Sequence, residues 1–195
     1  GMRGFIPHAA DYVVEKRYGD CKDMTSILVA LLRSEDIEAH FTWIGSRDLP
    51  YKYTELPSPV VDNHMIASVE LKGETIFLDA TGSYSPLGFP TSMIQGKESL
   101  ISKGDEYQVE VVPVIPKEKN LMVDTAFVSL EKGAVKGKGT LELTGLVKVA
   151  NSYRLINRSN KKTEDYVRRL LSRGSNKFFL DQFEVANVED LDKPI

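Results

Sequence analysis

The chain has 195 residues and a mass of 21.8 kDa, enough for one large or two small domains with a sizeable core. Its 25 basic and 28 acidic side chains give a formal charge of −3, which argues against nucleic acid or an anionic membrane as the main partner. No apolar run approaches the ~18 residues of a membrane-spanning helix, so we expect no membrane insertion. One cysteine excludes an internal disulfide and any multi-cysteine zinc site. The oligomeric state stays open.

The first third of the chain predicts two helices. Residues 9–16 predict a short one. Residues 21–33 predict a longer one, because Asp20 is a good N-cap, Asp23 can complete a capping box, and apolar side chains recur at helical spacing. Strands are then expected over 38–44, 65–71, 74–79 and 108–112, the second and third joined as a hairpin.

A long segment without a helix or strand pattern, residues 45–63, separates the first strand from the hairpin. It contains three prolines and the large side chains Tyr51, Tyr53 and Leu56. Loops of this length in compact domains are usually functional or mobile. We therefore expect this loop to border a site.

Pro113 and Pro116, followed by charged residues, predict a linker near residue 117. We expect an α+β domain over residues 1–116 and a smaller β-rich domain with one helix over residues 117–195. Within the second domain, strands are predicted over 122–130, 139–149 and 177–185, and the helix over 164–172 with Thr163 as its cap.

Cys21 is a candidate nucleophile because of its place in the predicted helix. It follows the N-cap directly, where unpaired N–H groups and the helix dipole favour a thiolate over a thiol. A thiolate so favoured is the reactive form of cysteine. The alternative is a small buried side chain, which is the commonest role of a lone cysteine.

A histidine and an aspartate are expected to meet on the predicted hairpin. If Lys72 and Gly73 form a two-residue turn, Ile66 faces Asp79, and His64 shares the face of Ile66 because side chains alternate along a strand. His64 then lies diagonal to Asp79, ~7–8 Å away between backbones and within side-chain reach. A carboxylate there can orient the imidazole and stabilise its charged form. A register shift of one residue would separate the two.

Together, Cys21, His64 and Asp79 supply the nucleophile, base and orienting acid of covalent acyl transfer. We expect no cofactor. We also expect no metal site, because the spacing of His8, His40 and His64 matches no metal-binding pattern.

Three blocks of sequence resemble those of the bacterial transglutaminase-like superfamily: Tyr18-Gly-Asp-Cys-Lys-Asp-Met24, Asn63-His-Met-Ile66 and Leu78-Asp-Ala-Thr81. The resemblance covers about residues 3–101. It implies a papain-like core, with a helix packed on an antiparallel sheet, in which Cys21 attacks an amide carbonyl, His64 shuttles the proton and Asp79 orients His64. Members of this superfamily carry out transglutamination, deamidation or peptide-bond cleavage, so the implied partner is a peptide or protein substrate.

The rest of the chain adds further expectations. Residues 137–195 resemble, more weakly, a domain of unknown function that often follows this core. Because helical sequence usually precedes the cysteine block in the superfamily, we expect the core to be truncated at its N-terminus. Residues 190–195 carry no signal of a structural ending, so we also expect the second domain to be truncated at its C-terminus. The domain order favours an extracytoplasmic parent protein. The alternative to an enzyme is a binding or scaffolding module that retains a papain-like core.

Overall fold

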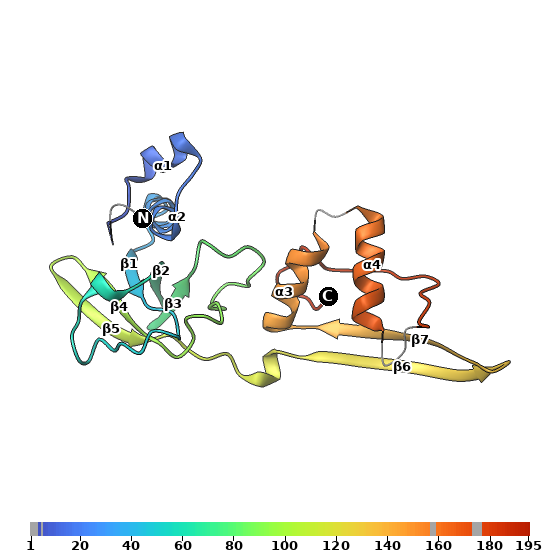
Figure 1. The fold of residues 1–195 in the computed structure, drawn as a ribbon. Helices are drawn as coiled ribbons and strands as arrows, with labels where there is room; N and C mark the ends of the chain where they lie inside the picture. The colour runs from blue at the N-terminus through green and yellow to red at the C-terminus, as the bar shows by residue number, and fades with distance from the viewer. Residues whose placement is uncertain (1–3, 5, 157–158, 173–176) are drawn as a thin grey trace. The chain divides into compact units, whose positions relative to one another are not determined.

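The helix that begins at Cys21 organises the first part of the chain. In the computed structural model, α2 spans Cys21–Ser34 and the shorter α1, Ala10–Lys16, packs against it (Figure 1). Both predicted helices are confirmed, as is the capping box: the Asp20 carboxylate accepts the N–H of Lys22 at 3.0 Å, and Asp23 accepts the N–H of Asp20 at 3.2 Å. The structure describes residues 4, 6–156, 159–172 and 177–195.

The chain forms two compact units, Gly1–Ile115 and Pro116–Ile195. The first is an α+β unit built on a curled antiparallel sheet of five strands in the order β3-β2-β1-β4-β5 (Figure 1). The strands are β1 Ala39–Ile44, β2 His64–Leu71, β3 Glu74–Leu78, β4 Glu98–Lys103 and β5 Glu106–Val111. The predicted α+β class is therefore confirmed for this unit.

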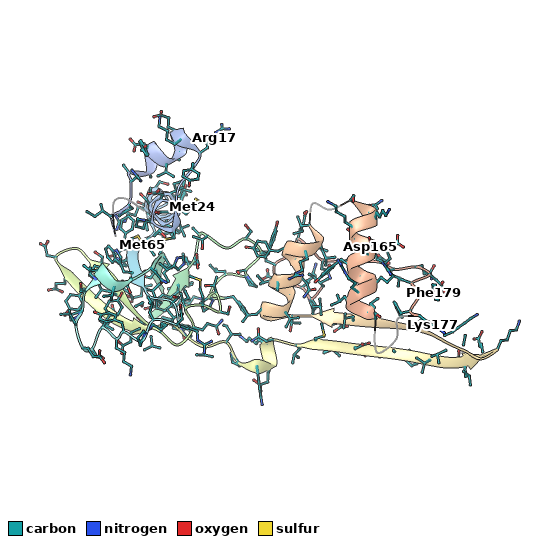
Figure 2. All side chains as sticks on the ribbon, in the orientation of Figure 1. Arg17, Met24, Met65, Asp165, Lys177 and Phe179 are labelled. Carbon is teal, nitrogen blue, oxygen red and sulfur yellow. The ribbon has the colours of Figure 1, made fainter. Side chains whose placement is uncertain are left out.

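Two groups of buried apolar side chains hold the first unit together. Val29 of α2 packs against Ala39 of β1 and Ala67 of β2, so α2 lies on these two adjacent strands. A second cluster is formed by Ile44, Ile66, Phe77, Ile94, Ile101 and Val112. Figure 2 shows Met65 on the part of the sheet beneath α2 and its labelled Met24. The first residues of α2 and of β2 are thus fixed close to one another by the core.

The β2–β3 hairpin has the predicted register. Leu71 pairs with Glu74 and Ala67 with Leu78, around a turn in which both Lys72 and Gly73 have positive φ. β4 is absent from the sequence prediction. Its six residues do not alternate between apolar and polar, and its position depends on distant pairing with β1 and β5.

The second unit differs from the predicted β-rich domain with one helix. Among its described residues it contains one two-stranded ribbon, two α-helices and a short 3-10 helix, η2, over Lys117–Lys119. The elements are β6 Met122–Glu131, β7 Ala134–Leu143, α3 Gly145–Leu155 and α4 Asn160–Leu171. The predicted helix over 164–172 corresponds to α4, but α4 begins four residues earlier. Its N-cap is Ser159, and Thr163, the predicted cap, lies inside the helix.

The predicted strand over 139–149 is wrong after Leu143, where the chain turns into α3. Gly145 has a φ of 58°, and a Cβ there would run into the carbonyl oxygen of Lys119 and the side-chain oxygen of Asn120. That Asn120 oxygen accepts the N–H of Leu146 at 2.8 Å and so satisfies the beginning of the helix from a distant part of the chain. Apolar residues continue to alternate across Gly145, from Leu141 to Val149, and this pattern predicted a single strand over 139–149.

Gly145→Ala is expected to destabilise the second unit by more than the cost of its positive φ alone. Gly133, in the β6–β7 turn, has a φ of 81° and open space where a Cβ would lie, so Gly133→Ala carries only the backbone cost of about 1–2 kcal/mol. Gly145→Ala adds the clash with Lys119 and Asn120. Denaturant unfolding of the two variants measures the difference, and equal losses of stability would contradict the account.

The predicted strand over 177–185 is also wrong, since no regular element forms there. Phe179 on this segment is 83% exposed, and it is labelled in Figure 2. The chain after this segment instead lies along α3. Ser152 donates to the carbonyl of Val188 at 3.3 Å, and the buried ammonium of Lys148 donates to the carbonyls of Asp190 and Lys193. These contacts fix the C-terminal segment without a strand ladder.

Candidate active site

The structure brings His64 and Asp79 together at the open end of the β2–β3 hairpin. His64 is the first residue of β2, and Asp79 directly follows β3. The His64 Nε2 atom lies 2.9 Å from the Asp79 Oδ2 atom, and both side chains are at least nine-tenths buried. The contact follows from the hairpin register. Asp79 faces position 66 of β2, and His64 lies two residues before that position on the same face, as the sequence predicts.

Two threonines hold the Asp79 carboxylate in place. Its Oδ1 atom accepts the N–H of Thr81 at 2.9 Å and the Thr81 hydroxyl at 2.6 Å, and its Oδ2 atom accepts the Thr91 hydroxyl at 3.3 Å. Burial opposes the charged carboxylate, but the hydrogen bonds to His64 and Thr81 outweigh it and lower the pKa of Asp79. Asp79 is therefore an ionised carboxylate directed at the imidazole.

The Cys21 thiol is the other partner of His64. The pKa of Cys21 is lowered, chiefly by its interaction with the His64 imidazole. Burial raises this pKa, and the backbone N–H of Met65 lowers it further. Burial lowers the pKa of His64, but the hydrogen bonds to Asp79 and Cys21 raise it to about 9. Because Nε2 is directed at Asp79, Nδ1 is the nitrogen left for the thiol. The arrangement favours a thiolate beside an imidazolium at neutral pH.

Acidic residues beside Cys21 oppose its thiolate, but each has its own partner. The Asp20 carboxylate forms an ion pair with Lys22, a side chain that is itself buried. Asp23 accepts the backbone N–H of His8 and lies 2.9 Å from the His8 ring nitrogen Nδ1. Asp20 still raises the pKa of Cys21, by less than His64 lowers it. The half-buried thiol thus keeps a net preference for the thiolate.

Thr25 positions the nucleophile relative to the base. This fully buried residue lies one turn after Cys21 on α2, and its hydroxyl oxygen is 2.8 Å from the carbonyl oxygen of Cys21. The same hydroxyl is 3.0 Å from the carbonyl oxygen of Met65, the residue after His64. One hydroxyl therefore joins the first turn of α2 to the start of β2, which are the two backbones that carry Cys21 and His64.

Thr25→Val is expected to cost about 1–3 kcal/mol of folding stability, because it leaves two buried carbonyls without this donor. It is also expected to slow alkylation of Cys21, because the Thr25 hydroxyl no longer holds the start of α2, with its thiol, at a fixed distance from the start of β2, with its imidazole. Thr25→Ser keeps the hydroxyl and serves as the matched variant, with near wild-type reactivity. Denaturant unfolding and Cys21 alkylation measure both effects. Unchanged reactivity in a folded Thr25→Val protein would exclude this positioning role.

The loop over residues 45–63 is anchored to the sheet. The Lys97 ammonium donates to the carbonyls of Leu49 and Tyr51 at 2.7 and 2.9 Å, and the Tyr53 N–H donates to the Glu98 carboxylate at 2.7 Å. At its end the side chain of Asn63, the residue before His64, accepts the N–H of Ser46 at 2.9 Å and donates to its hydroxyl at 2.8 Å. The two ends of the loop are thereby joined next to His64.

The structure places the three histidines in separate surroundings. His8 contacts Asp23, His64 contacts Asp79, and His40 lies 3.0 Å from the Lys103 ammonium. Across the described residues no group of three His, Cys, Asp or Glu side chains is arranged to hold a metal ion.

Three residues of the site were missed by the sequence analysis: Thr25, Thr81 and Thr91. Thr81 stands two residues after Asp79, a spacing typical of local hydrogen bonding to an aspartate, and this signal was available. Thr25, four residues after Cys21, shares a helix face with it. Nothing local marks Thr91, which is 12 residues from Asp79.

Within the part of the chain that the structure describes, none of the helices has the length and apolar character needed to cross a bilayer. Comparisons of the chain with protein-family models, with curated proteins and with solved structures give no match.

Proposed function

We propose that the first unit is a papain-like, transglutaminase-like core that acts on amide bonds of peptides or proteins through a thioester on Cys21. The observation that carries the proposal is the 2.9 Å contact between His64 and Asp79, together with the mutual effect of His64 and Cys21, which raises the His64 pKa to about 9 and lowers the Cys21 pKa. A nucleophile, a base bonded to it and a third group that orients the base are the parts that nucleophilic catalysis requires.

In the first half-reaction, the Cys21 thiolate attacks the carbonyl carbon of the amide. A C–S bond forms, and the carbonyl electron pair moves to oxygen. The Cys21 N–H lies in the first turn of α2, where helix N–H groups lack intrahelical acceptors, and it is suited to bind this oxyanion. When the C=O bond re-forms, the C–N bond breaks, and the departing nitrogen takes the proton from His64. A thioester and a neutral imidazole remain.

In the second half-reaction, an amine or water attacks the thioester carbonyl and gives a proton to His64. The C–S bond breaks, and the thiolate leaves beside the restored imidazolium. Throughout, Asp79 stays ionised and holds His64 through Nε2, so that Nδ1 is directed at the thiol. Transfer and hydrolysis differ only in which acceptor reaches the thioester.

Two probes test this function. The first is p-nitrophenyl acetate, which releases nitrophenolate in a burst when the Cys21 thiolate takes up its acetyl group. The second is benzyloxycarbonyl-glutaminylglycine with hydroxylamine, which gives a hydroxamate by transfer or a free acid by hydrolysis. Intact-mass measurement after an acid quench locates the acyl group on Cys21. Products that require Cys21 support the proposal.

Cys21→Ala is the control variant for both probes. A thiol that alkylates readily but is acylated by neither probe would overturn the enzyme proposal. The first unit would then be a binding or scaffolding module that retains a papain-like core.

A further inference from the structure

The half-buried carboxyl group of Asp62 lies two residues before His64 and has no part in the proposed mechanism. Its Oδ2 atom contacts the hydroxyl of Tyr53, a side chain that is only 3% exposed. The same hydroxyl oxygen lies 3.0 Å from the carbonyl oxygen of Trp43 on β1. The carboxyl, the phenol and the carbonyl therefore form a series that joins the loop over residues 45–63 to the sheet.

The hydroxyl of Tyr53 has one proton for two neighbouring oxygens. If Asp62 is ionised, both neighbours are acceptors only, and one of the two close contacts has no hydrogen. If Asp62 is protonated, its carboxyl donates to the Tyr53 oxygen, and the Tyr53 hydroxyl donates to the Trp43 carbonyl. Both contacts are then hydrogen bonds, so the closed arrangement favours a protonated Asp62.

Asp79, in the same unit, shows what a buried carboxylate needs in order to stay ionised. Its oxygens are contacted by an imidazole, a backbone N–H and two threonine hydroxyls, and its pKa is lowered. Among the described residues, the Asp62 carboxyl has only the Tyr53 hydroxyl. Burial raises the pKa of Asp62 to about 6, against the opposing effects of the Tyr53 hydrogen bond and the charge of Lys97.

The charged and titratable side chains around this series do not supply the missing donor. Lys97 favours the ionised Asp62, but its ammonium donates to two carbonyls of the loop itself. Glu98 accepts the N–H of Tyr53 at 2.7 Å, and the Tyr51 ring packs edge-on against the Tyr53 ring. Burial, the Asp62 carboxylate and Glu98 raise the pKa of Tyr53, so the phenol keeps its proton.

The contact between Tyr53 and Asp62 closes the loop tip, residues 54–61, next to the proposed site. Tyr53 precedes this tip and Asp62 follows it, so the contact brings the two ends of the tip together. The tip is exposed, and Leu56 near its centre is 61% accessible. A segment with few buried apolar contacts opens readily. The contact with Asp62 therefore decides how firmly the tip is held beside His64.

We propose that Asp62 is a proton-dependent latch for the loop tip: the protonated carboxyl holds Tyr53 and closes the tip beside the proposed active site, and the ionised carboxylate releases it. In the released tip, Asp62 lies in water and has an ordinary pKa of about 3.9. Because closure raises this pKa to about 6, the proton stabilises the closed tip fully below about pH 3.9. This stabilisation is lost as the pH rises through about 6. The latch goes beyond the proposed acyl transfer and uses none of its catalytic side chains.

The test is amide hydrogen exchange in the loop tip, measured by NMR between pH 5 and pH 8 on the full chain. The amides of Glu55 and Ser58 report on the tip, because their N–H groups are bonded to the Lys52 carbonyl and the Tyr51 hydroxyl, each at 3.2 Å. Each rate is divided by the intrinsic rate at the same pH to give a protection factor. The two pKa values predict protection about tenfold greater at pH 5 than at pH 8.

Asp62→Asn keeps the size of the side chain but cannot titrate, so its protection factors are expected to change by less than about twofold over the same range. Tyr53→Phe removes the other half of the latch and is expected to lose the pH dependence as well. Asp48→Asn is the matched control from the same loop. A hydrogen bond from Ser46 lowers the pKa of Asp48, so this variant keeps the wild-type dependence.

Equal protection at pH 5 and pH 8 in the wild type would overturn the latch. So would a pH dependence that persists in Asp62→Asn, or an Asp62 carboxyl carbon that titrates near pH 4 in the wild-type protein. No substrate or thiol reagent enters these measurements. The latch is therefore tested separately from the acyl transfer proposed for Cys21.

Discussion

Cys21→Ala is expected to abolish acylation of the chain and to reduce amide-bond turnover by on the order of 10⁴-fold or more, because no other group can form the thioester. The chain contains a single cysteine, so no second thiol can replace it. The half-buried side chain is small, and its removal leaves the fold intact with a stability loss of about 1 kcal/mol or less. Intact mass after exposure to p-nitrophenyl acetate measures acylation, and denaturant unfolding measures stability.

The same variant has a second expected signature at His64. The hydrogen bond and charge of Cys21 both raise the pKa of His64, so that pKa is expected to fall in Cys21→Ala. An NMR titration of the His64 ring measures the shift. Turnover retained in the folded variant, or an unchanged His64 titration, would show that the thiol and the imidazole do not act as a pair.

Asp79→Asn is expected to reduce turnover by ~10²–10⁴-fold, because the amide does not hold the imidazolium or its orientation as a carboxylate does. Burial lowers the pKa of His64, whereas Asp79 and Cys21 raise it to about 9, and loss of the Asp79 charge moves it back toward 6.5. The imidazolium needed to protonate the departing amine is then lost at a lower pH. The basic limb of the activity profile therefore moves to lower pH.

The stability that Asp79 gives to the folded protein is also expected to depend on pH, through the pKa of His64. A raised folded-state pKa stabilises the fold fully below the unfolded value of 6.5, and this contribution is lost as the pH rises through about 9. The stability difference between wild type and Asp79→Asn should therefore shrink across that interval. Glu70→Gln removes an exposed carboxylate from β2 and is the matched control. A His64 pKa that stays near 9 in Asp79→Asn would contradict the role assigned to Asp79.

The parts of the site that could be predicted from the sequence depend on local rules. The Asp20 cap fixes where α2 begins and hence places Cys21 in its first turn. The two-residue turn at Lys72 and Gly73 fixes the hairpin register, which puts His64 diagonal to Asp79. Both inferences depend only on residues that are close in sequence, within the first turn of α2 or within the β2–β3 hairpin.

The parts that could not be predicted depend on distant contacts. β4 is a strand because it pairs with β1 and β5, and Thr91 reaches Asp79 from a loop. α3 begins where Asn120 satisfies its first turn, and buried Lys148 holds it to the C-terminal segment. The second unit was predicted as β-rich with one helix because such contacts leave no periodic signal in the sequence.

The proposed mechanism depends most directly on the Cys21–His64 pair, and the rate of Cys21 alkylation by iodoacetamide against pH tests it. In wild type, the reactive thiolate is expected well below the ordinary pKa of ~8.5, with a second inflection near 9 as His64 loses its proton. In His64→Ala, one inflection at or above ~8.5 is expected. His40→Ala, which removes a buried histidine elsewhere in the sheet, should keep the wild-type profile. The same profile in wild type and His64→Ala would contradict the account.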